Sequence, residues 1–315
     1  MNNESVVDGG AAATGPVVSF GDRLARVFAR QGQLCVGIDP HSWLLGEWNL
    51  PDSAAGVESF GRTVVAAAAA GRVGIVKPQI AFFERFGSAG FVALERVLAD
   101  ARQAGLLVIG DAKRGDLGSS VEAYAQAWLS PGSPLEVDAL TLAAYMGVGS
   151  LDSPLNLAAT YGKGVFLLAA TSNPEAADIQ RAVVADGPRA GSSVARAILD
   201  DVAERNALAA SAHAATNAAM SPTTSFGSIG VVLGATLDLP SFGIDLEAAP
   251  TECRTPVLAP GFGHQGGHIM DLISIYGGYA GGVIVSESRS VLSAGPHRIQ
   301  EAIERRVAEV GAVRG

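Results

Sequence analysis

Eight short apolar runs, each followed by a stretch with helical character, constrain the fold of this chain more than any other feature. Their interiors are almost continuously apolar and rich in β-branched residues, which is typical of parallel strands covered by helices. The runs are Gln33–Asp39, Val73–Lys77, Leu106–Asp111, Ala139–Ala143, Gly164–Ala170, Ser228–Gly234, Pro256–Ala259 and Gly282–Ser286. Eight strand–helix units in roughly 250 residues predict a single-domain (β/α)8 TIM barrel of the α/β class. A doubly wound open sheet is the alternative, but no G-x-G-x-x-G follows the first run.

The segments outside this alternation differ in composition. Residues 1–18 are polar and rich in Gly and Ala, so we expect a flexible N-terminal arm before a barrel domain over residues 19–315. Phe20–Arg30 has apolar residues at helical spacing and predicts a helix ahead of the first strand. An Ala/Ser/Thr-rich insert near residues 206–225 precedes the sixth strand. Its first part is compatible with a helix, and Met220–Ser225 is typical of a loop.

The overall charge and hydropathy exclude several classes of partner. The chain has 315 residues and a net charge of −9, with no cluster of Lys and Arg. Nucleic-acid binders usually carry a basic patch, so no nucleic acid is expected as a partner. The longest apolar runs are too short to span a bilayer, and the N-terminus lacks the basic and apolar regions of a secretory signal. We therefore expect a cytoplasmic protein with no membrane partner.

Residues that commonly bind metals are not arranged as a site in the sequence. Cys35 and Cys253 lack the C-x-x-C or Cys/His spacing of metal ligands, and we expect two idle thiols in a reducing compartment. His41, His264 and His268 fall near predicted strand ends, but no carboxylates are spaced around them to complete a metal site. The sequence therefore predicts no resident metal, and no motif for an organic cofactor is present.

Polar side chains gather where the predicted strands end. In barrels of this kind the active site forms at the carboxyl ends of the strands. Charged groups that end apolar strands are costly to bury unless they are paired, so several of them at one mouth indicate a site. These polar residues are Asp39, Lys77, Asp111, Lys113, Thr141, Thr171, Ser172, Gln265 and Arg289.

The strongest local signal is the segment Asp111-Ala-Lys113-Arg-Gly-Asp116. Residues two apart on an extended chain share a face, so Asp111 and Lys113 should point the same way, with Lys77 on the neighbouring strand. Alternating charges hold one another in place, and the nearby carboxylates favour the protonated form of Lys113. A solvated ion-pair cluster on a loop is the alternative. The charges of Asp39 and Lys77 at matching strand ends favour a site over that alternative.

A second signal lies near the end of the chain. The glycine-rich segment Gly261–Gly267 follows the seventh strand, and Arg289 follows the eighth. The corresponding loops of such barrels commonly hold phosphate, because glycine lets backbone N–H groups approach it and arginine binds it bidentately. A plain turn is the alternative for the glycines alone. The presence of Gln265 and Arg289 in these two loops favours a phosphate site.

These motifs together resemble the orotidine 5'-phosphate decarboxylase family over most of the chain. Asp111-x-Lys113-x-x-Asp116 resembles the family's signature. The other segments similar to the family are Gly37–Pro40, Lys77–Pro78, Thr171–Pro174, Pro260–Gly266 and Ser288–Ser290. Asp39-Pro40-His41 and the stretch Asp111–Ser119 resemble the bacterial branch with longer chains.

The resemblance implies a catalytic set of Lys113, Asp111, Asp116 and Lys77. Lys113 would protonate C6 of the pyrimidine as carbon dioxide leaves, and Asp111 would lie against the substrate carboxylate. Asp39 and Lys77 would hold the ribose hydroxyls, and Lys77 would also complete the charge array. The resemblance implies no cofactor.

The resemblance also implies a set of substrate-binding residues, namely Asp39, Ser120, Thr141, Ser172, Gln265, Gly266 and Arg289. Ser172 would bind the base, while Gln265 and Arg289 would take the phosphate. The family residue that matches Asp116 reaches into the neighbouring subunit's site, which implies a homodimer with shared active sites. Ser120 stands where the family usually has threonine, so its hydroxyl is less fixed without the β-branch.

Decarboxylation suits these residue types. Loss of carbon dioxide leaves a carbanion in the plane of the ring, so a protein without an electron sink must supply electrostatics and a proton. The resemblance therefore predicts conversion of orotidine 5'-monophosphate to uridine 5'-monophosphate in de novo pyrimidine biosynthesis. Two alternatives stay open. One is a magnesium-dependent sugar-phosphate aldolase or decarboxylase with the same Asp-x-Lys-x-x-Asp motif, and the other is a non-catalytic nucleotide-binding barrel.

Overall fold

The computed structural model describes residues 17–216, 226–247 and 253–314. Eight parallel strands close into a single barrel in sequence order, with β8 pairing back to β1. The strands are β1 Leu34–Ile38, β2 Ile75–Pro78, β3 Leu107–Arg114, β4 Ala139–Leu142, β5 Gly164–Ala170, β6 Ile229–Leu233, β7 Val257–Pro260 and β8 Val283–Glu287. The predicted (β/α)8 TIM barrel is thus confirmed, and the open-sheet alternative is wrong. The largest difference is at β3, which was expected to end at Asp111 and continues to Arg114.

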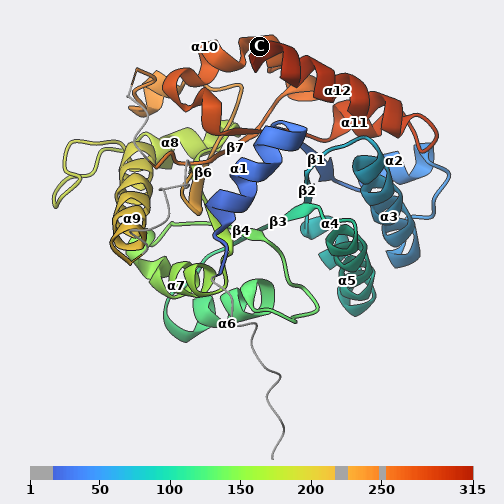
Figure 1. Cartoon of the computed structure of the whole chain (residues 1–315), viewed down its shortest axis with the longest axis horizontal. Coiled ribbons are helices and arrows are strands. Elements are labelled where there is room, and N and C mark those ends of the chain that lie inside the picture. The colour runs from blue at the N-terminus through green and yellow to red at the C-terminus, as the bar shows by residue number, and fades with distance from the viewer. Residues whose placement is uncertain (1–16, 217–225, 248–252, 315) are drawn as a thin grey trace, which may run out of the picture.

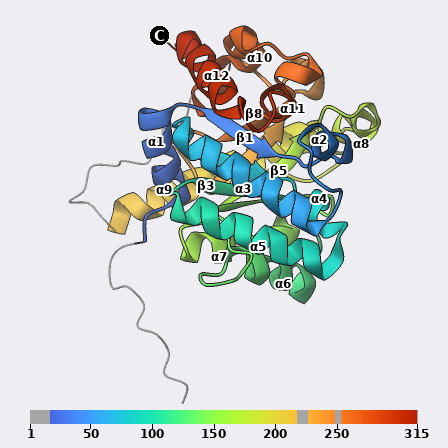
Figure 2. The ribbon, with the colours of Figure 1, turned by 90° about the vertical axis from the view of Figure 1, so that its right-hand side faces the viewer.

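Helices surround this barrel (Figure 1), and α3 and α5 pack side by side on one flank (Figure 2). The α-helices are α1 Phe20–Gln31, α2 Ser42–Glu47, α3 Ala54–Ala70, α4 Ala81–Glu84, α5 Gly87–Gln103, α6 Gly118–Leu129, α7 Asp152–Thr160, α8 Ala177–Gln180, α9 Val194–Thr216, α10 Leu272–Tyr276, α11 Arg289–Leu292 and α12 Ile299–Arg314. The 3-10 helices are η1 Val148–Leu151, η2 Pro174–Ala176, η3 Leu239–Phe242, η4 Gly263–Gln265, η5 Ile269–Asp271 and η6 Gly277–Gly282. Within the part of the chain that the structure describes, no helix has both the length and the apolar character needed to cross a bilayer.

Helix α1 closes the end of the barrel where the strands begin, and Figure 1 shows it lying across that end. The Ser19 side chain caps the helix by accepting a hydrogen bond from the backbone N–H of Asp22. Phe20, Leu24 and Phe28 are buried in one cluster with side chains from the barrel interior. Each such side chain contributes roughly 1.5–3 kcal/mol when fully buried. The amphipathic segment expected at Phe20–Arg30 is therefore the floor of the barrel.

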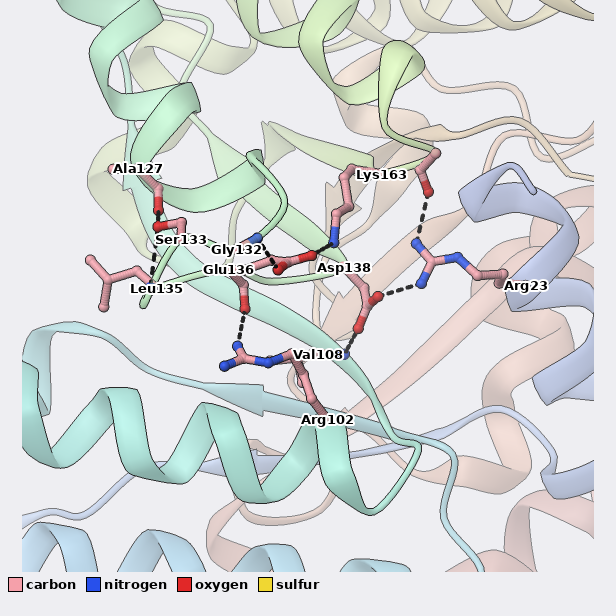
Figure 3. Close-up of polar contacts among 11 residues, drawn as sticks. Arg23, Arg102, Val108, Ala127, Gly132, Ser133, Leu135, Glu136, Asp138 and Lys163 are labelled. Carbon is pink, nitrogen blue, oxygen red and sulfur yellow. Dashed lines mark hydrogen bonds and ion pairs between the residues drawn. The ribbon is translucent and has the colours of Figure 1, made fainter. Parts of the chain in front are cut away.

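Polar side chains at the same end of the barrel link neighbouring segments by hydrogen bonds and ion pairs. We call Arg23, Glu136, Asp138 and Lys163 the floor cluster (Figure 3). The Asp138 carboxylate accepts from the Arg23 guanidinium and, at 2.8 Å, from the backbone N–H of Val108. The Lys163 ammonium donates to Glu136 Oε1 at 2.6 Å. These contacts join α1, the start of β3 and the segments that precede β4 and β5.

Helix α9 contains the beginning of the segment that was expected to be an insert. Asn206 is buried in this helix, where its side-chain amide donates to the carbonyl of Ile229 at 2.7 Å and accepts from the same residue's N–H at 3.2 Å. The stretch as far as Thr216 is therefore the end of a barrel helix that packs against β6. Residues 217–225, with the loop expected at Met220–Ser225, and residues 1–16 of the expected arm lie outside the described residues.

Candidate active site

Four side chains meet at the opposite end of the barrel, and we call Lys77, Asp111, Lys113 and Thr141 the mouth cluster. They come from the three neighbouring strands β2, β3 and β4. The Asp111 carboxylate lies at the centre, with Oδ2 at 2.9 Å from Lys77 Nζ and Oδ1 at 2.6 Å from Lys113 Nζ. Thr141 Oγ1 donates to Asp111 Oδ1 at 3.0 Å. Lys77 and Asp111 are only 6% and 8% exposed, whereas the Lys113 side chain is 44% exposed and faces the open end.

The backbone of Lys113 adopts a left-handed conformation with φ of 50°. The pairing of β3 with β4 shifts register between Gly110 and Arg114, so the chain forms a bulge at this point. Thr141 supports the bulge, because its Oγ1 accepts from the Lys113 N–H at 2.9 Å. The prediction that Asp111 and Lys113 meet is right, but the extended-chain reason for it is wrong. A non-glycine residue in this conformation is strained, and such strain concentrates at functional sites.

Charge interactions inside the mouth cluster outweigh burial. Burial alone raises the pKa of Asp111, but the ammonium groups of Lys77 and Lys113 hold that pKa well below its usual range. Burial alone lowers the pKa of Lys77, but the carboxylates of Asp111 and Asp39 raise it above its usual value. Both groups are therefore ionised at neutral pH, and each is held in its charged form by the other.

Gln79 is a member of this site that the sequence reasoning missed. It forms a parallel bridge with Asp111, and its amide lies between the carboxylate of that residue and the ammonium of Lys113. With the amide nitrogen turned toward Asp111, the nitrogen donates to Oδ2 and the amide oxygen accepts from Lys113 Nζ at 3.3 Å. The strand period offered a signal, because Gln79 is two residues beyond Lys77 and lies on the same face.

Asp39 lies beside the mouth cluster, just past the end of β1. Its charge contributes to the raised pKa of Lys77, which places the two groups close together. Its Oδ1 atom is buried and has no hydrogen-bond partner among the described residues. Buried polar atoms in native proteins are nearly always satisfied, so an acceptor without a donor at a strand end is a position for a ligand hydroxyl.

The loop after β7 and the start of α11 form the other side of the mouth. Gly263 and Gly266 have φ of 70° and 103°, conformations that favour glycine. Gln265 and Gly266 are exposed at the tip of this loop, and Arg289 begins α11. Within the described ranges, neither the Gln265 amide nor the Arg289 guanidinium makes a hydrogen bond or ion pair. Backbone N–H groups, an amide and a guanidinium are the usual ligands of phosphate.

Other predicted site residues are not brought to the mouth cluster within this chain. The Asp116 carboxylate accepts from the backbone N–H of Leu117 at 2.8 Å and makes no ion pair among the residues described. Ser120 is exposed in the first turn of α6, and Ser172 is exposed in the loop after β5. Within one chain, the described residues show no hydrogen bond or ion pair between Asp116 and Lys113.

The side chains described in the structure include no group of three or more His, Cys, Asp and Glu residues placed to hold a metal ion. What the mouth cluster offers is a buried carboxylate flanked by two ammonium groups, one of which is accessible from outside. Such an arrangement can repel a second carboxylate, stabilise developing negative charge and deliver a proton.

Comparison with known proteins gives a consistent result along most of the chain. The family model described as Orotidine 5'-phosphate decarboxylase / HUMPS family matches residues 32–302. The orotidine 5'-phosphate decarboxylase of Salinispora tropica is 48% identical over 278 residues, which cover 88% of this chain and 91% of that protein. The Streptomyces coelicolor protein of the same name is 46% identical, with the same coverage.

Solved structures agree with the sequence comparison. A crystal structure from Streptomyces avermitilis, described as a candidate orotidine 5'-phosphate decarboxylase, has a TM-score of 0.78 at 43% identity and covers 98% of this chain and 99% of that one. The OMP decarboxylase of Leishmania donovani has a TM-score of 0.65 at 27% identity, with 94% and 99% covered. This chain therefore belongs to the orotidine 5'-phosphate decarboxylase / HUMPS family.

Proposed function

We propose that this protein decarboxylates orotidine 5'-monophosphate to uridine 5'-monophosphate, a step of de novo pyrimidine biosynthesis, without a cofactor. The observation that carries the proposal is the position of Lys113, whose ammonium is held 2.6 Å from Asp111 at the open end of the barrel. Relatives at 46–48% identity carry the name of this activity. A cytoplasmic location fits an enzyme that acts on a small soluble metabolite.

The proposed chemistry follows from the charges of the mouth cluster. The substrate carboxylate would approach Asp111, whose own charge is maintained by Lys77 and Lys113. Repulsion between the two carboxylates would raise the energy of the bound substrate relative to the transition state, in which the negative charge moves from the substrate carboxylate onto C6 as neutral carbon dioxide departs. Lys113 would then face the developing carbanion at C6 and transfer a proton to it, so one preorganised group supplies both electrostatics and acid catalysis.

Remote parts of the nucleotide would supply the binding energy that holds the substrate against this repulsion. Asp39 Oδ1, which has no partner among the residues that the structure describes, would accept a hydrogen bond from a ribose hydroxyl, with Lys77 nearby. Gln265, Gly266 and Arg289 would take the phosphate at the far side of the mouth. Contacts away from the reacting carbon contribute in this way because binding energy there can offset destabilisation at the reaction centre. Ser172 would contact the base, and Thr141 would hold Asp111 in place.

The protein would act as a homodimer with shared active sites. Asp116 has no ion-pair partner in its own chain among the described residues, and Leu117 beside it is 59% exposed. Tyr145 is 82% exposed in the loop after β4, and a backbone hydrogen bond from Ala143 to Arg114 joins that loop to the one that carries Asp116. Large apolar side chains exposed on two connected loops favour an interface at this place. A twofold axis here would bring Asp116 and Ser120 of each chain into the other's site.

A direct assay tests the main proposal. The purified protein should consume orotidine 5'-monophosphate, which is measured as a decrease in the absorbance of this substrate. The rate of consumption should be unchanged by EDTA. No turnover of the nucleotide, with EDTA-sensitive turnover of a sugar phosphate instead, would favour the alternative, a magnesium-dependent sugar-phosphate aldolase or decarboxylase. Tight binding of the nucleotide with no turnover would favour a non-catalytic nucleotide-binding barrel.

A further inference from the structure

A buried carboxylate that the proposed chemistry does not use lies directly behind the phosphate side of the mouth. Glu287 is the last residue of β8 and is 1% exposed. Its Oε2 accepts from Arg306 Nε at 2.7 Å and from Ser290 Oγ at 2.5 Å. Its Oε1 has no hydrogen-bond partner in the part of the chain that is described. The side chain therefore faces the helix layer, where α12 supplies Arg306 and α11 supplies Ser290.

The two donors to Glu287 form the surface on which the glycine-rich loop rests. A Cβ atom placed on Gly263 would lie 2.8 Å from Ser290 Oγ and 2.9 Å from Arg306 Nη2, so the loop backbone packs directly against both. The N–H of Gly263 donates to the carbonyl of Gly267 at 2.8 Å, which closes the loop on itself. The position of the loop backbone at Gly263 therefore depends on where these two side chains lie.

The ion pair itself is a weak explanation for a charge at this place. Burial lowers the pKa of Arg306, but the carboxylates of Glu287 and Glu309 raise it above its usual value. Taking two charges out of water costs several kcal/mol, and apolar residues of similar volume are often as stable as a buried pair. A carboxylate differs from an apolar side chain because it forms directional hydrogen bonds. One oxygen of Glu287 accepts from donors on two helices and so fixes the positions of these donors relative to each other.

We propose that Glu287 is a positioning residue for the phosphate. Through Ser290 and Arg306 it holds the loop Gly261–Gly267 in place opposite Arg289, the residue that immediately precedes Ser290. The inference rests on the proposed function, since it assumes that the loop and Arg289 bind the phosphate of a nucleotide. Glu287 itself lies outside the site and acts only through its neighbours.

The test compares a nucleotide with the same nucleoside lacking phosphate. Glu287→Gln keeps the shape of the side chain and removes its charge. The variant should lower kcat/KM for orotidine 5'-monophosphate by about tenfold or more, mainly through KM, and change kcat/KM for orotidine less than about twofold. Arg289→Ala serves as a reference for direct phosphate contact and should lower the nucleotide value by about 30-fold or more. Glu309→Gln, which alters the exposed partner of Arg306, is the matched control and should leave both substrates within about twofold of wild type.

A purely structural role predicts a different result. Loss of stability with equal losses for the two substrates, or unchanged nucleotide kinetics in a folded variant, would overturn the inference. If Glu287→Gln does not fold, Ser290→Ala removes one of the two contacts and should produce a smaller loss with the same preference for the nucleotide. A wild-type protein that turns over neither substrate would count against the proposed function alone. Calorimetry with uridine 5'-monophosphate and uridine then makes the same comparison without turnover, and equal losses of affinity in the variant would again overturn the inference.

Discussion

The two ends of the barrel each carry a cluster in which lysine is paired with a carboxylate, but the clusters differ in how completely they are satisfied. In the floor cluster each carboxylate oxygen has its own donor. Glu136 accepts from Lys163 and from the backbone N–H of Gly132, and Asp138 accepts from Arg23 and a backbone N–H. Its two ion pairs balance in charge, because Arg23 pairs with Asp138 and Lys163 pairs with Glu136.

In the mouth cluster, by contrast, the charged groups and their partners are not matched one to one. Two ammonium groups share the single carboxylate of Asp111, and the neighbouring Asp39 keeps a buried oxygen without a donor among the described residues. Lys113 is held in a left-handed backbone conformation and remains 44% exposed. A protein that needed only a stable fold would gain little from such an arrangement. The difference shows that paired charges alone do not indicate a functional site. A site is indicated where a buried polar atom lacks a partner and a charged residue has a strained backbone.

The sharpest way to break this comparison is to remove Lys113. Lys113→Ala should lower kcat by far more than a hundredfold, because the proposed proton donor and the charge facing the carbanion are lost together. The free energy of unfolding should change by less than about 1 kcal/mol, since the Lys113 side chain is 44% exposed and the buried Asp111 keeps Lys77 as its partner. Steady-state kinetics and urea denaturation measure the two quantities. A variant that keeps more than about a hundredth of the wild-type rate would refute the role of Lys113.

A second experiment asks whether the mouth is completed by another chain. Lys113→Ala and Asp116→Ala should each be almost inactive alone. In a mixed dimer with shared sites one site carries both changes and the other carries neither. Random reassortment makes half of the dimers mixed, so about a quarter of all sites should recover. The variants are unfolded together, refolded and assayed beside each variant refolded alone.

The contacts of the floor cluster lie within one chain, so mixing two chains would not restore a contact that a substitution in this cluster removes. If the refolded mixture stays as inactive as its components while mass spectrometry detects mixed dimers, Asp116 acts within its own chain. The mouth cluster would then be complete in a single subunit, and the shared-site model would be wrong.

The mouth was predictable from the sequence because its residues end strands, and strand ends meet in a closed barrel. The role of Gln79 was not predicted, because its amide is uncharged and so gives a weaker sequence signal at the end of an apolar strand than a charged residue does. The bulge at Lys113 could not be read from residue types, since lysine rarely adopts a positive φ. The fold followed from the eight apolar runs, and the strand limits moved most at this bulge.

The floor was not predictable in the same way. Arg23 and Asp138 are 115 residues apart, and nothing in their local sequence connects them. Glu136 and Lys163 precede strands in segments that read as ordinary solvated loops. Pairings of this kind depend on how helix α1 crosses the barrel, and that crossing is set by the packing of the whole core.

Removal of a floor charge should reverse the pattern seen at the mouth. Lys163→Met leaves the Glu136 carboxylate without its cation, and breaking a largely buried pair should lower the free energy of unfolding by about 2–3 kcal/mol. kcat/KM should stay within about twofold of wild type. Arg62→Met is the matched control, because Arg62 pairs with Asp100 on an exposed surface and its loss should lower the free energy of unfolding clearly less than the loss of Lys163 does. Equal losses in the two variants would show that the floor pair is no more than a surface pair.

The smallest expected effect concerns acid and the carboxylate of Glu136. Burial raises the pKa of Glu136. The Lys163 ammonium and the N–H of Gly132 lower this pKa by more than burial raises it, so it lies below its usual value. A depressed pKa contributes stability above the unfolded-state value of about 4.3, and that contribution is lost as pH falls through the folded-state pKa. Wild type should therefore exceed Glu136→Gln by on the order of 1 kcal/mol near pH 7, and the difference should shrink below about pH 4.5.

The same titration in a Lys163→Met background separates charge from shape. Without the ammonium the largest favourable partner of the Glu136 carboxylate is gone, so the pH-dependent part of the difference between glutamate and glutamine should nearly disappear. Urea denaturation of the four proteins between about pH 3 and pH 7 provides the cycle, because the loss continues through the lowered folded-state pKa of Glu136. A difference that persists unchanged across this range in the presence of Lys163 would mean that Glu136 holds the floor by its hydrogen bonds alone. The two ends of the barrel would then differ in kind, with ionisation required only at the mouth.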